Sequence, residues 1–300
     1  MATVGYGDFR YELDESWPTV PEGWSLGSVS DHAIDSRDRV FVFSRHKHSV
    51  VVFEADSGKF VTSWGECEFK EPHGMYIDAD DFVWVTDRQE HVVTKHTPHG
   101  EKLLELGRRG WAMMTVTPYG ESLDGPFNMP AGVAIAEDGA IFVADGYGNH
   151  QVRRFSPDGE LELSWGKSGL EPGEFALVHN IGIDSQDRIL ICDREASRIQ
   201  FFDREGQFIE LWDDVNSPGD VYISPDKLVY VAEQGRSMAR GDQPVGISIF
   251  TESGELVGRF RGEEETTMRM PHSVWTDSHG NVFVGELGDD GNHMRKFVKI

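Results

Sequence analysis

The chain has 300 residues, of which 38% are hydrophobic, and a formal net charge of −24 with a pI near 4.8. Such an acidic surface repels phosphate groups, which argues against nucleic acid or an anionic membrane as a partner. No segment approaches the run of about 18 apolar residues that a transmembrane helix needs. The two cysteines, Cys67 and Cys192, do not imply a disulfide framework. The N-terminus has no basic start and no apolar run, so we expect no secretory signal and a cytoplasmic protein.

One phrase recurs six times along the chain. It consists of an apolar strand, a short turn rich in Asp, Ser and Gly, and a second strand. The six copies begin at residues 29, 72, 130, 178, 218 and 271. Most copies continue with a third and a fourth strand, as in HQVRRFSPDGELELSWG. Units of four strands at intervals of roughly 40 to 58 residues are typical of propeller blades. The sequence therefore predicts an all-β, six-bladed β-propeller that occupies residues 1–300 as one domain. A β-sandwich is the alternative, but it does not explain six copies of one phrase.

The ends and the longer intervals of the chain complete this prediction. Residues 1–25 precede the first copy and contain FRYEL, which we expect to form a strand that completes the last blade. That blade has only three clear strands before Ile300, and closing the ring removes an exposed sheet edge. The longer intervals place insertions at residues 111–128 and 235–245.

Histidines stand at one register of the repeat, five residues before the residue that ends the first strand. Copies two, four and six have His73, His179 and His272, whereas the other copies have Ser30, Ala131 and Gly219. Inner strands of alternate blades lie about 120° apart around the channel, so the three imidazoles should point inward from three sides. Three histidines with an open fourth position are the pattern of a catalytic zinc site, and another divalent metal is also compatible. The alternative is that each histidine caps its own strand, but three at one register favour the metal.

A second set of candidates follows the second strand of each copy, where the turns should line one mouth of the channel. Arg45 and Arg194 each offer a planar fork for a substrate carboxylate. The alternative for these two arginines is an ion pair that joins adjacent blades. Tyr147 lies between two glycines, and a tyrosine beside a metal ion can act as a base.

The repeats resemble NHL repeats. From about Ser30 to its end, the chain resembles the peptidyl-α-hydroxyglycine α-amidating lyase domain and its bacterial relatives. The motifs that carry the resemblance occur in the same order along most of the chain: PHGMYID…VWVTD, FNMPAGVAI…IFVADGYGNHQVRRFSPDG, FALVHNIGID…CDREASRIQFF and MPHSVWTD…VFVGE. That family is a six-bladed propeller that cleaves a carbinolamide, N-acyl-α-hydroxyglycine, into an amide and glyoxylate.

The resemblance also implies roles for individual residues. The residues that match the family's zinc ligands are His73, His179 and His272. The residues that match its catalytic or substrate-binding groups are Arg45, Tyr147, Arg194 and Met270, the last near the substrate. In the animal enzymes an aspartate after the third histidine binds a structural calcium, but this chain has Ser273 there, so the calcium is not carried over. Gly148 and Phe201 replace cysteines of those secreted enzymes, so their disulfides are absent.

We therefore expect a zinc-dependent lyase without a redox cofactor, active as a monomer or weak oligomer. Its substrate should be a small molecule or a peptide terminus with a carboxylate. No monooxygenase domain accompanies the lyase-like region, so the peptide substrate of the animal enzymes is not carried over, and the insertion at 111–128 should reshape the mouth. Two alternatives stay open. One is a zinc hydrolase of a lactone, ester or amide, and the other is a non-catalytic NHL-type scaffold that binds protein partners.

Overall fold

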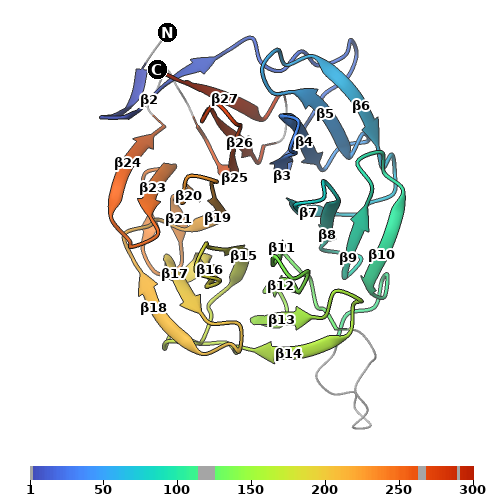
Figure 1. Ribbon diagram of the computed structural model, residues 1–300, viewed down its shortest axis with the longest axis vertical. Helices are drawn as coiled ribbons and strands as arrows, with labels where there is room; N and C mark the ends of the chain where they lie inside the picture. Colours follow the sequence, from blue (N-terminus) through green and yellow to red (C-terminus); the bar gives the residue numbers. More distant parts are fainter. Residues whose placement is uncertain (1–2, 114–125, 263–267, 289–290) are drawn as a thin grey trace.

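The computed structural model describes residues 3–113, 126–262, 268–288 and 291–300. These residues form six antiparallel sheets around a central channel, so the predicted six-bladed β-propeller is confirmed (Figure 1). Within these ranges the helical content is one short 3-10 turn, η1 (Arg194–Ala196). The described residues contain no helix with the length and apolar character needed to cross a membrane.

In each blade the chain runs outward from the channel, strand by strand. The innermost strands are β3 (Val29–Ile34), β7 (Pro72–Ile77), β11 (Gly132–Ile135), β15 (Val178–Ile183), β19 (Pro218–Ile223) and β25 (Pro271–Thr276). The second strands are β4 (Arg39–Ser44), β8 (Val83–Asp87), β12 (Ile141–Asp145), β16 (Ile189–Asp193), β20 (Leu228–Glu233) and β26 (Val282–Glu286). The third strands are β5 (Val50–Glu54), β9 (Val92–His96), β13 (Gln151–Phe155), β17 (Arg198–Phe202), β23 (Gly246–Thr251) and β27 (Met294–Lys299).

An outer strand completes each blade, and the outer strand of the sixth blade closes the ring. In the first five blades the outer strands are β6 (Phe60–Trp64), β10 (Lys102–Gly107), β14 (Leu161–Trp165), β18 (Phe208–Trp212) and β24 (Leu256–Arg261). In the sixth blade β2 (Phe9–Asp14), which contains FRYEL, pairs with β27, and β1 (Thr3–Tyr6) pairs with β2. Both ends of the chain therefore lie in one sheet (Figure 1).

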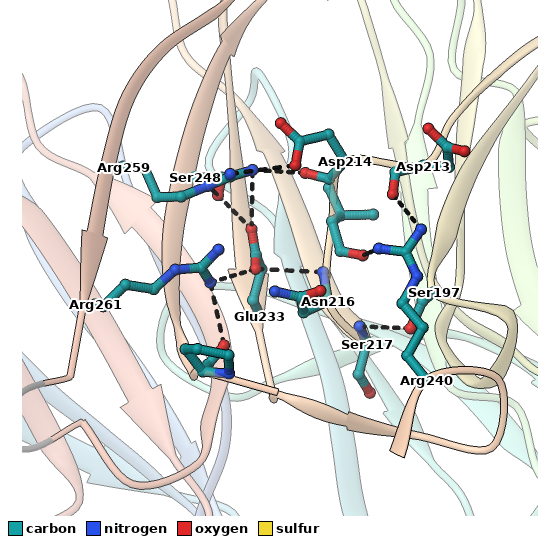
Figure 2. Close-up of polar contacts among 12 residues, drawn as sticks. Ser197, Asp213, Asp214, Asn216, Ser217, Glu233, Arg240, Ser248, Arg259 and Arg261 are labelled. Carbon is teal, nitrogen blue, oxygen red and sulfur yellow. Dashed lines mark hydrogen bonds and ion pairs between the residues drawn. The ribbon is translucent and has the colours of Figure 1, made fainter. Parts of the chain in front are cut away.

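Two insertions interrupt the repeat. The insertion in blade five contains the hairpin of β21 (Arg236–Ser237) and β22 (Gly241–Asp242). Arg240 anchors this hairpin by donating to the carbonyl oxygens of Asp213 and Val215 (Figure 2). Residues 114–125 of the insertion at 111–128 lie outside the described residues, so the expected effect of this insertion on the mouth stays a prediction.

The hydrophobic core lies between adjacent blades. The second strands are apolar along most of their length because both of their faces pack against neighbouring blades; β12, for example, is fully buried. Phe142 of β12 packs with Phe175 and Phe202 of blade four. Phe53 and Phe283 belong to a similar cluster between blades one and six. The outer strands alternate between half-buried and exposed residues. This wedge-like packing holds the inner strands, and hence the side chains at their ends.

Candidate metal centre

The three candidate histidines lie together at one end of the channel. Each is the second residue of an inner strand, β7, β15 or β25. The imidazole centroids are 4.8 to 5.1 Å apart, and the atoms that could bind a metal all lie within 4.8 Å of one another. All three side chains are buried. We refer to His73, His179 and His272 as the histidine tripod.

A carbonyl of the next blade holds the far nitrogen of each imidazole. The Nδ1–H groups donate at 2.9, 2.6 and 2.5 Å, in the pairs His73 to Ala131, His179 to Gly219 and His272 to Ser30. The acceptors stand at the repeat register of the three blades that lack a histidine. Because a carbonyl oxygen only accepts hydrogen bonds, Nδ1 carries the proton and Nε2 keeps its lone pair. The repeat register marked these positions only as lacking a histidine, and nothing in the sequence beyond a small residue at each of them indicated that their carbonyls accept hydrogen bonds.

The Nε2 atoms suit a metal ion. Nε2 of His179 and of His272 are buried and have no hydrogen-bond partner among the described residues, and Nε2 of His73 lies 3.0 Å from the Tyr147 hydroxyl. A buried polar atom without a partner costs free energy. A divalent metal removes that cost by taking up the lone pairs. Three neutral imidazoles, each fixed by a hydrogen bond on its other nitrogen, are the ligand set of a catalytic zinc site with an open position.

Electrostatics keeps the imidazoles in the metal-binding form. Burial is the main cause that lowers the pKa of each histidine. For His272, burial and the positive charges of Arg45 and Arg194 lower the pKa to about 3. The charge of Arg194 likewise follows burial in lowering the pKa of His179. The tripod is therefore neutral at pH 7 and can bind a metal without first releasing protons.

The predicted Tyr and Arg residues line the same mouth. Tyr147, in the turn after β12, accepts a hydrogen bond at its hydroxyl from Nη1 of Arg194 at 3.3 Å. Arg45, which follows β4, donates from Nε to the carbonyl oxygen of Pro72 at 3.1 Å. Pro72 directly precedes His73, so the structure brings Arg45, Tyr147 and Arg194 beside the tripod. Met270 lies two residues before His272 with 44% of its surface exposed.

Sequence reasoning missed Arg88. This residue follows β8 as Arg45 follows β4 and Arg194 follows β16, so it shares their register. Its guanidinium carbon lies 4.4 Å from the centroid of the Tyr147 ring, and its charge contributes to the lowered pKa of His73. The signal was present in the repeat, because TDR in copy two matches FSR in copy one and CDR in copy four.

Buried carboxylates hold the segments that lead into the inner strands. In blade four, Oδ1 of Asp193 accepts the backbone N–H groups of Ala176 and Leu177, and Oδ2 pairs with Arg198 at 2.8 Å. Leu177 lies two residues before His179, so this contact positions the histidine-bearing strand. Figure 2 shows the version in blade five, where Glu233 accepts the N–H of Asn216 and pairs with arginines of β24.

A group of buried acidic and polar side chains lies next to the tripod on the inner strands. Asp31 and Asp220 are buried and accept the N–H groups of Met75 and Val274. Burial raises the pKa of Asp220 to about 7, and burial together with the charge of Asp220 raises that of Asp31. The Ser273 hydroxyl is hydrogen-bonded to Nδ1 of His32 at 2.7 Å.

A cavity of about 480 Å³ opens at the opposite mouth of the channel and is lined by Tyr76, Tyr222 and Trp275 among others. None of its lining residues belongs to the tripod. The cavity and the metal centre are therefore separate features of the channel.

Comparisons with known proteins confirm the resemblance to amidating lyases and NHL proteins. A family model described as NHL repeat matches residues 127–155. The chain is 29% identical over 316 residues to peptidylglycine alpha-amidating monooxygenase of Rattus norvegicus, covering 93% of this chain and 31% of that protein. It is 28% identical over 335 residues to peptidyl-alpha-hydroxyglycine alpha-amidating lyase 1 of Drosophila melanogaster, covering 96% and 60%. It is also 28% identical over 312 residues to NHL repeat-containing protein 3 of Homo sapiens, covering 97% and 84%. The chain thus spans about a third of the length of the monooxygenases it matches.

Solved structures with the same fold carry other names. Virginiamycin B lyase from Staphylococcus aureus aligns with a TM-score of 0.60 at 16% identity, over 97% of this chain and 89% of that one. A gluconolactonase from Xanthomonas campestris aligns with a TM-score of 0.61 at 14% identity, over 91% and 87%. These structures show the fold alone. Since one fold serves differently named reactions, the function has to be argued from the site.

Proposed function

We propose that this chain is a zinc-dependent carbon–nitrogen lyase that cleaves an N-acyl-α-hydroxyglycine-type carbinolamide, or a closely related α-hydroxy amide, into an amide and glyoxylate. The observation that carries the proposal is the neutral tripod with the Tyr147 hydroxyl 3.0 Å from Nε2 of His73. The similarity over 96% of the chain to a protein named peptidyl-alpha-hydroxyglycine alpha-amidating lyase 1 supports the reaction class.

The tripod would hold the metal through its three Nε2 atoms. A zinc ion held there would supply Lewis acidity that lowers the pKa of the substrate hydroxyl. The phenolic oxygen of Tyr147 would take the proton of that substrate hydroxyl. The electron pair of the broken O–H bond then forms the C=O bond of glyoxylate while the C–N bond breaks. The nitrogen leaves as a neutral amide after Tyr147 returns the proton, so the reaction consumes no water and no net proton.

The arginines supply charge and orientation. The Nη1–H of Arg194 donates to the Tyr147 oxygen at 3.3 Å and so fixes the direction of that oxygen. Arg45 donates from Nε to the Pro72 carbonyl, and its Nη1 makes only a long contact of 4.0 Å with Oε1 of Glu71. Its terminal N–H groups can therefore bind the substrate carboxylate. Partial burial lowers the pKa of Arg45, although 28% of its side chain is exposed at the mouth, where a substrate can reach it. In a chain of net charge −24, this local group attracts an anionic substrate.

Turnover in isotopic water tests the reaction class. Zinc-loaded protein should convert α-hydroxyhippurate to benzamide and glyoxylate. In water enriched in ¹⁸O, the benzamide should stay unlabelled and no benzoate should form. Hydrolysis of the amide would place ¹⁸O in benzoate instead, and that result would replace the lyase by the hydrolase alternative.

The similarity to NHL repeat-containing protein 3 keeps a second candidate, a scaffold that binds partners without catalysis. The metal content of the purified protein separates the two candidates. The lyase proposal requires metal in the wild type and its loss in His73→Ala, whereas a scaffold predicts no difference between them.

A further inference from the structure

Arg88 contacts Tyr147 differently from the other arginines at the mouth. Its guanidinium lies 4.4 Å from the centroid of the Tyr147 ring. Arg194 lies 5.7 Å from that centroid and reaches the hydroxyl instead. An arginine over an aromatic face at such a distance makes a favourable cation–π contact. Tyr147 is therefore held at its ring by Arg88 of blade two and at its oxygen by both His73 of blade two and Arg194 of blade four.

The backbone of Tyr147 is fixed by close packing, but its side chain extends into the mouth. A Cβ atom at Gly146 would lie 1.7 Å from the Val178 carbonyl oxygen, and one at Gly148 would lie 2.2 Å from the Asn128 side chain. These short distances explain why the two residues that flank Tyr147 are glycines. The Tyr147 ring packs edge-to-face with the imidazoles of His73 and His179, with centroids 5.2 and 5.8 Å apart. Its orientation thus depends on groups from other blades.

Arg88 is itself held in place. Its Nη2 pairs with Oε1 of Glu71, and its backbone N–H donates to the Glu71 carbonyl at 3.0 Å. The N–H of Glu71 in turn donates to Asp87 at 3.0 Å. The Nε of Arg88 is buried without an acceptor among the described residues. A purely structural arginine would be expected to use that donor, so the contact with the Tyr147 ring accounts for the orientation better than the hydrogen bonds alone.

We propose that Arg88 is a positioning residue that orients the Tyr147 ring so that its hydroxyl faces Nε2 of His73 and the bound substrate. This inference rests on the proposed function, in which Tyr147 is the base. A misplaced base slows the chemical step more than it weakens substrate binding. Arg88→Met should therefore lower kcat about 10- to 100-fold and change KM less than about threefold. Arg88→Lys keeps the charge but loses the planar group, and should recover part of the rate.

A double-mutant cycle tests whether Arg88 acts through Tyr147. The variants Arg88→Met, Tyr147→Phe and their combination are assayed as zinc-loaded proteins with α-hydroxyhippurate, with zinc content and unfolding midpoint recorded for each. In the Tyr147→Phe background, Arg88→Met should cost less than about twofold because the group that it positions is gone. The same fold loss in both backgrounds, or a change confined to KM, would overturn the proposal.

A second readout needs no turnover. The chain has seven tyrosines, so protein labelled with 3-fluorotyrosine gives a fluorine spectrum in which the resonance missing from Tyr147→Phe identifies Tyr147. That resonance should shift in Arg88→Met. The matched control is Arg204→Met, because Arg204 also lies over a ring, that of Phe142 at 5.9 Å, and pairs with Asp138 and Asp187 in turns far from the tripod. An unchanged resonance in Arg88→Met overturns the positioning role alone, whereas a wild-type protein that releases no glyoxylate overturns the proposed function.

Discussion

At the scale of single residues, the geometry of the metal centre depends on how closely two strands approach. The Ala131 carbonyl oxygen accepts both His73 Nδ1–H, at 2.9 Å, and the Thr86 hydroxyl, at 2.9 Å. Gly74 permits this arrangement, because a Cβ atom at residue 74 would lie 2.3 Å from the same oxygen. The residue after a metal ligand is therefore constrained by the hydrogen bond that orients the ligand.

We predict that Gly74→Ala lowers zinc affinity about 10-fold or more, because the added methyl group displaces the carbonyl that fixes His73. Competition with a chelating dye measures the affinity. Gly182→Ala is the matched control in β15, since its Cβ would meet a side-chain methyl of Ile223 at 2.7 Å and stay 3.3 Å from the Val221 carbonyl oxygen. Equal zinc affinities for the two variants would show that the carbonyl does not matter.

The repeat in the sequence shows which side chain occupies each register position, and this decided how much of the site could be predicted. The tripod was predictable because side-chain identity repeats at a fixed register, and the ring places that register at one end of the channel. The carbonyl partners were not predictable, because every residue has a carbonyl. The role of Arg88 was hidden for a related reason, since its partner Tyr147 lies one blade away and one position out of register.

At the scale of elements, the recurring device is the buried carboxylate that ends the second strand of five blades. These residues are Asp87, Asp145, Asp193, Glu233 and Glu286. Each accepts a backbone N–H from a residue 16 or 17 positions earlier, in the segment before the inner strand. The acidic residues can be read from the sequence, but hydrogen bonds between residues 16 or 17 positions apart leave no local sequence pattern. The strands could therefore be predicted, whereas the carboxylates that anchor them could not.

Asp193→Ala should destabilise the protein by about 3–5 kcal/mol, because it leaves Arg198 buried without its carboxylate and releases two N–H groups. Burial raises the pKa of Asp193 even though Arg198 opposes the shift, so the pair is costly to bury and still more costly to break. The matched control is Asp138→Ala, whose side chain is 58% exposed and pairs with Arg204. That change should cost less than about 1 kcal/mol. Urea unfolding measures both, and similar losses would contradict the anchoring role.

At the scale of the whole molecule, buried titratable groups in the channel make stability depend on pH. Burial lowers the pKa of His32 to about 3, from an ordinary value of 6.5, so its contribution is present above pH 6.5 and is lost as the pH falls. The pKa of Asp220 is raised to about 7 from 3.8, so its contribution is fully present below pH 3.8 and is lost as the pH rises from there to about 7. Asp31 shifts in the same direction.

The unfolding midpoint of the metal-free protein should fall as the pH drops below 6.5, because four buried imidazoles outweigh the opposing effect of the two aspartates. The decline arises because the imidazoles of the unfolded chain take up protons and the buried ones do not, whereas the aspartates favour the folded state at low pH, where they stay protonated. Calorimetry at a series of pH values measures the midpoint. Asp220→Asn should steepen the decline between pH 6.5 and about 4, because it removes part of the opposing effect, and an unchanged slope in this variant would contradict the assignment to the aspartate pair.

Zinc titration of chelator-treated protein, with bound zinc and glyoxylate release from α-hydroxyhippurate recorded together, tests the central claim most directly. The account predicts that glyoxylate release rises in proportion to bound zinc and levels off at about one zinc per chain, and that His179→Ala shows neither tight binding nor release. Full release of glyoxylate without zinc, or one bound zinc without any release, would contradict it.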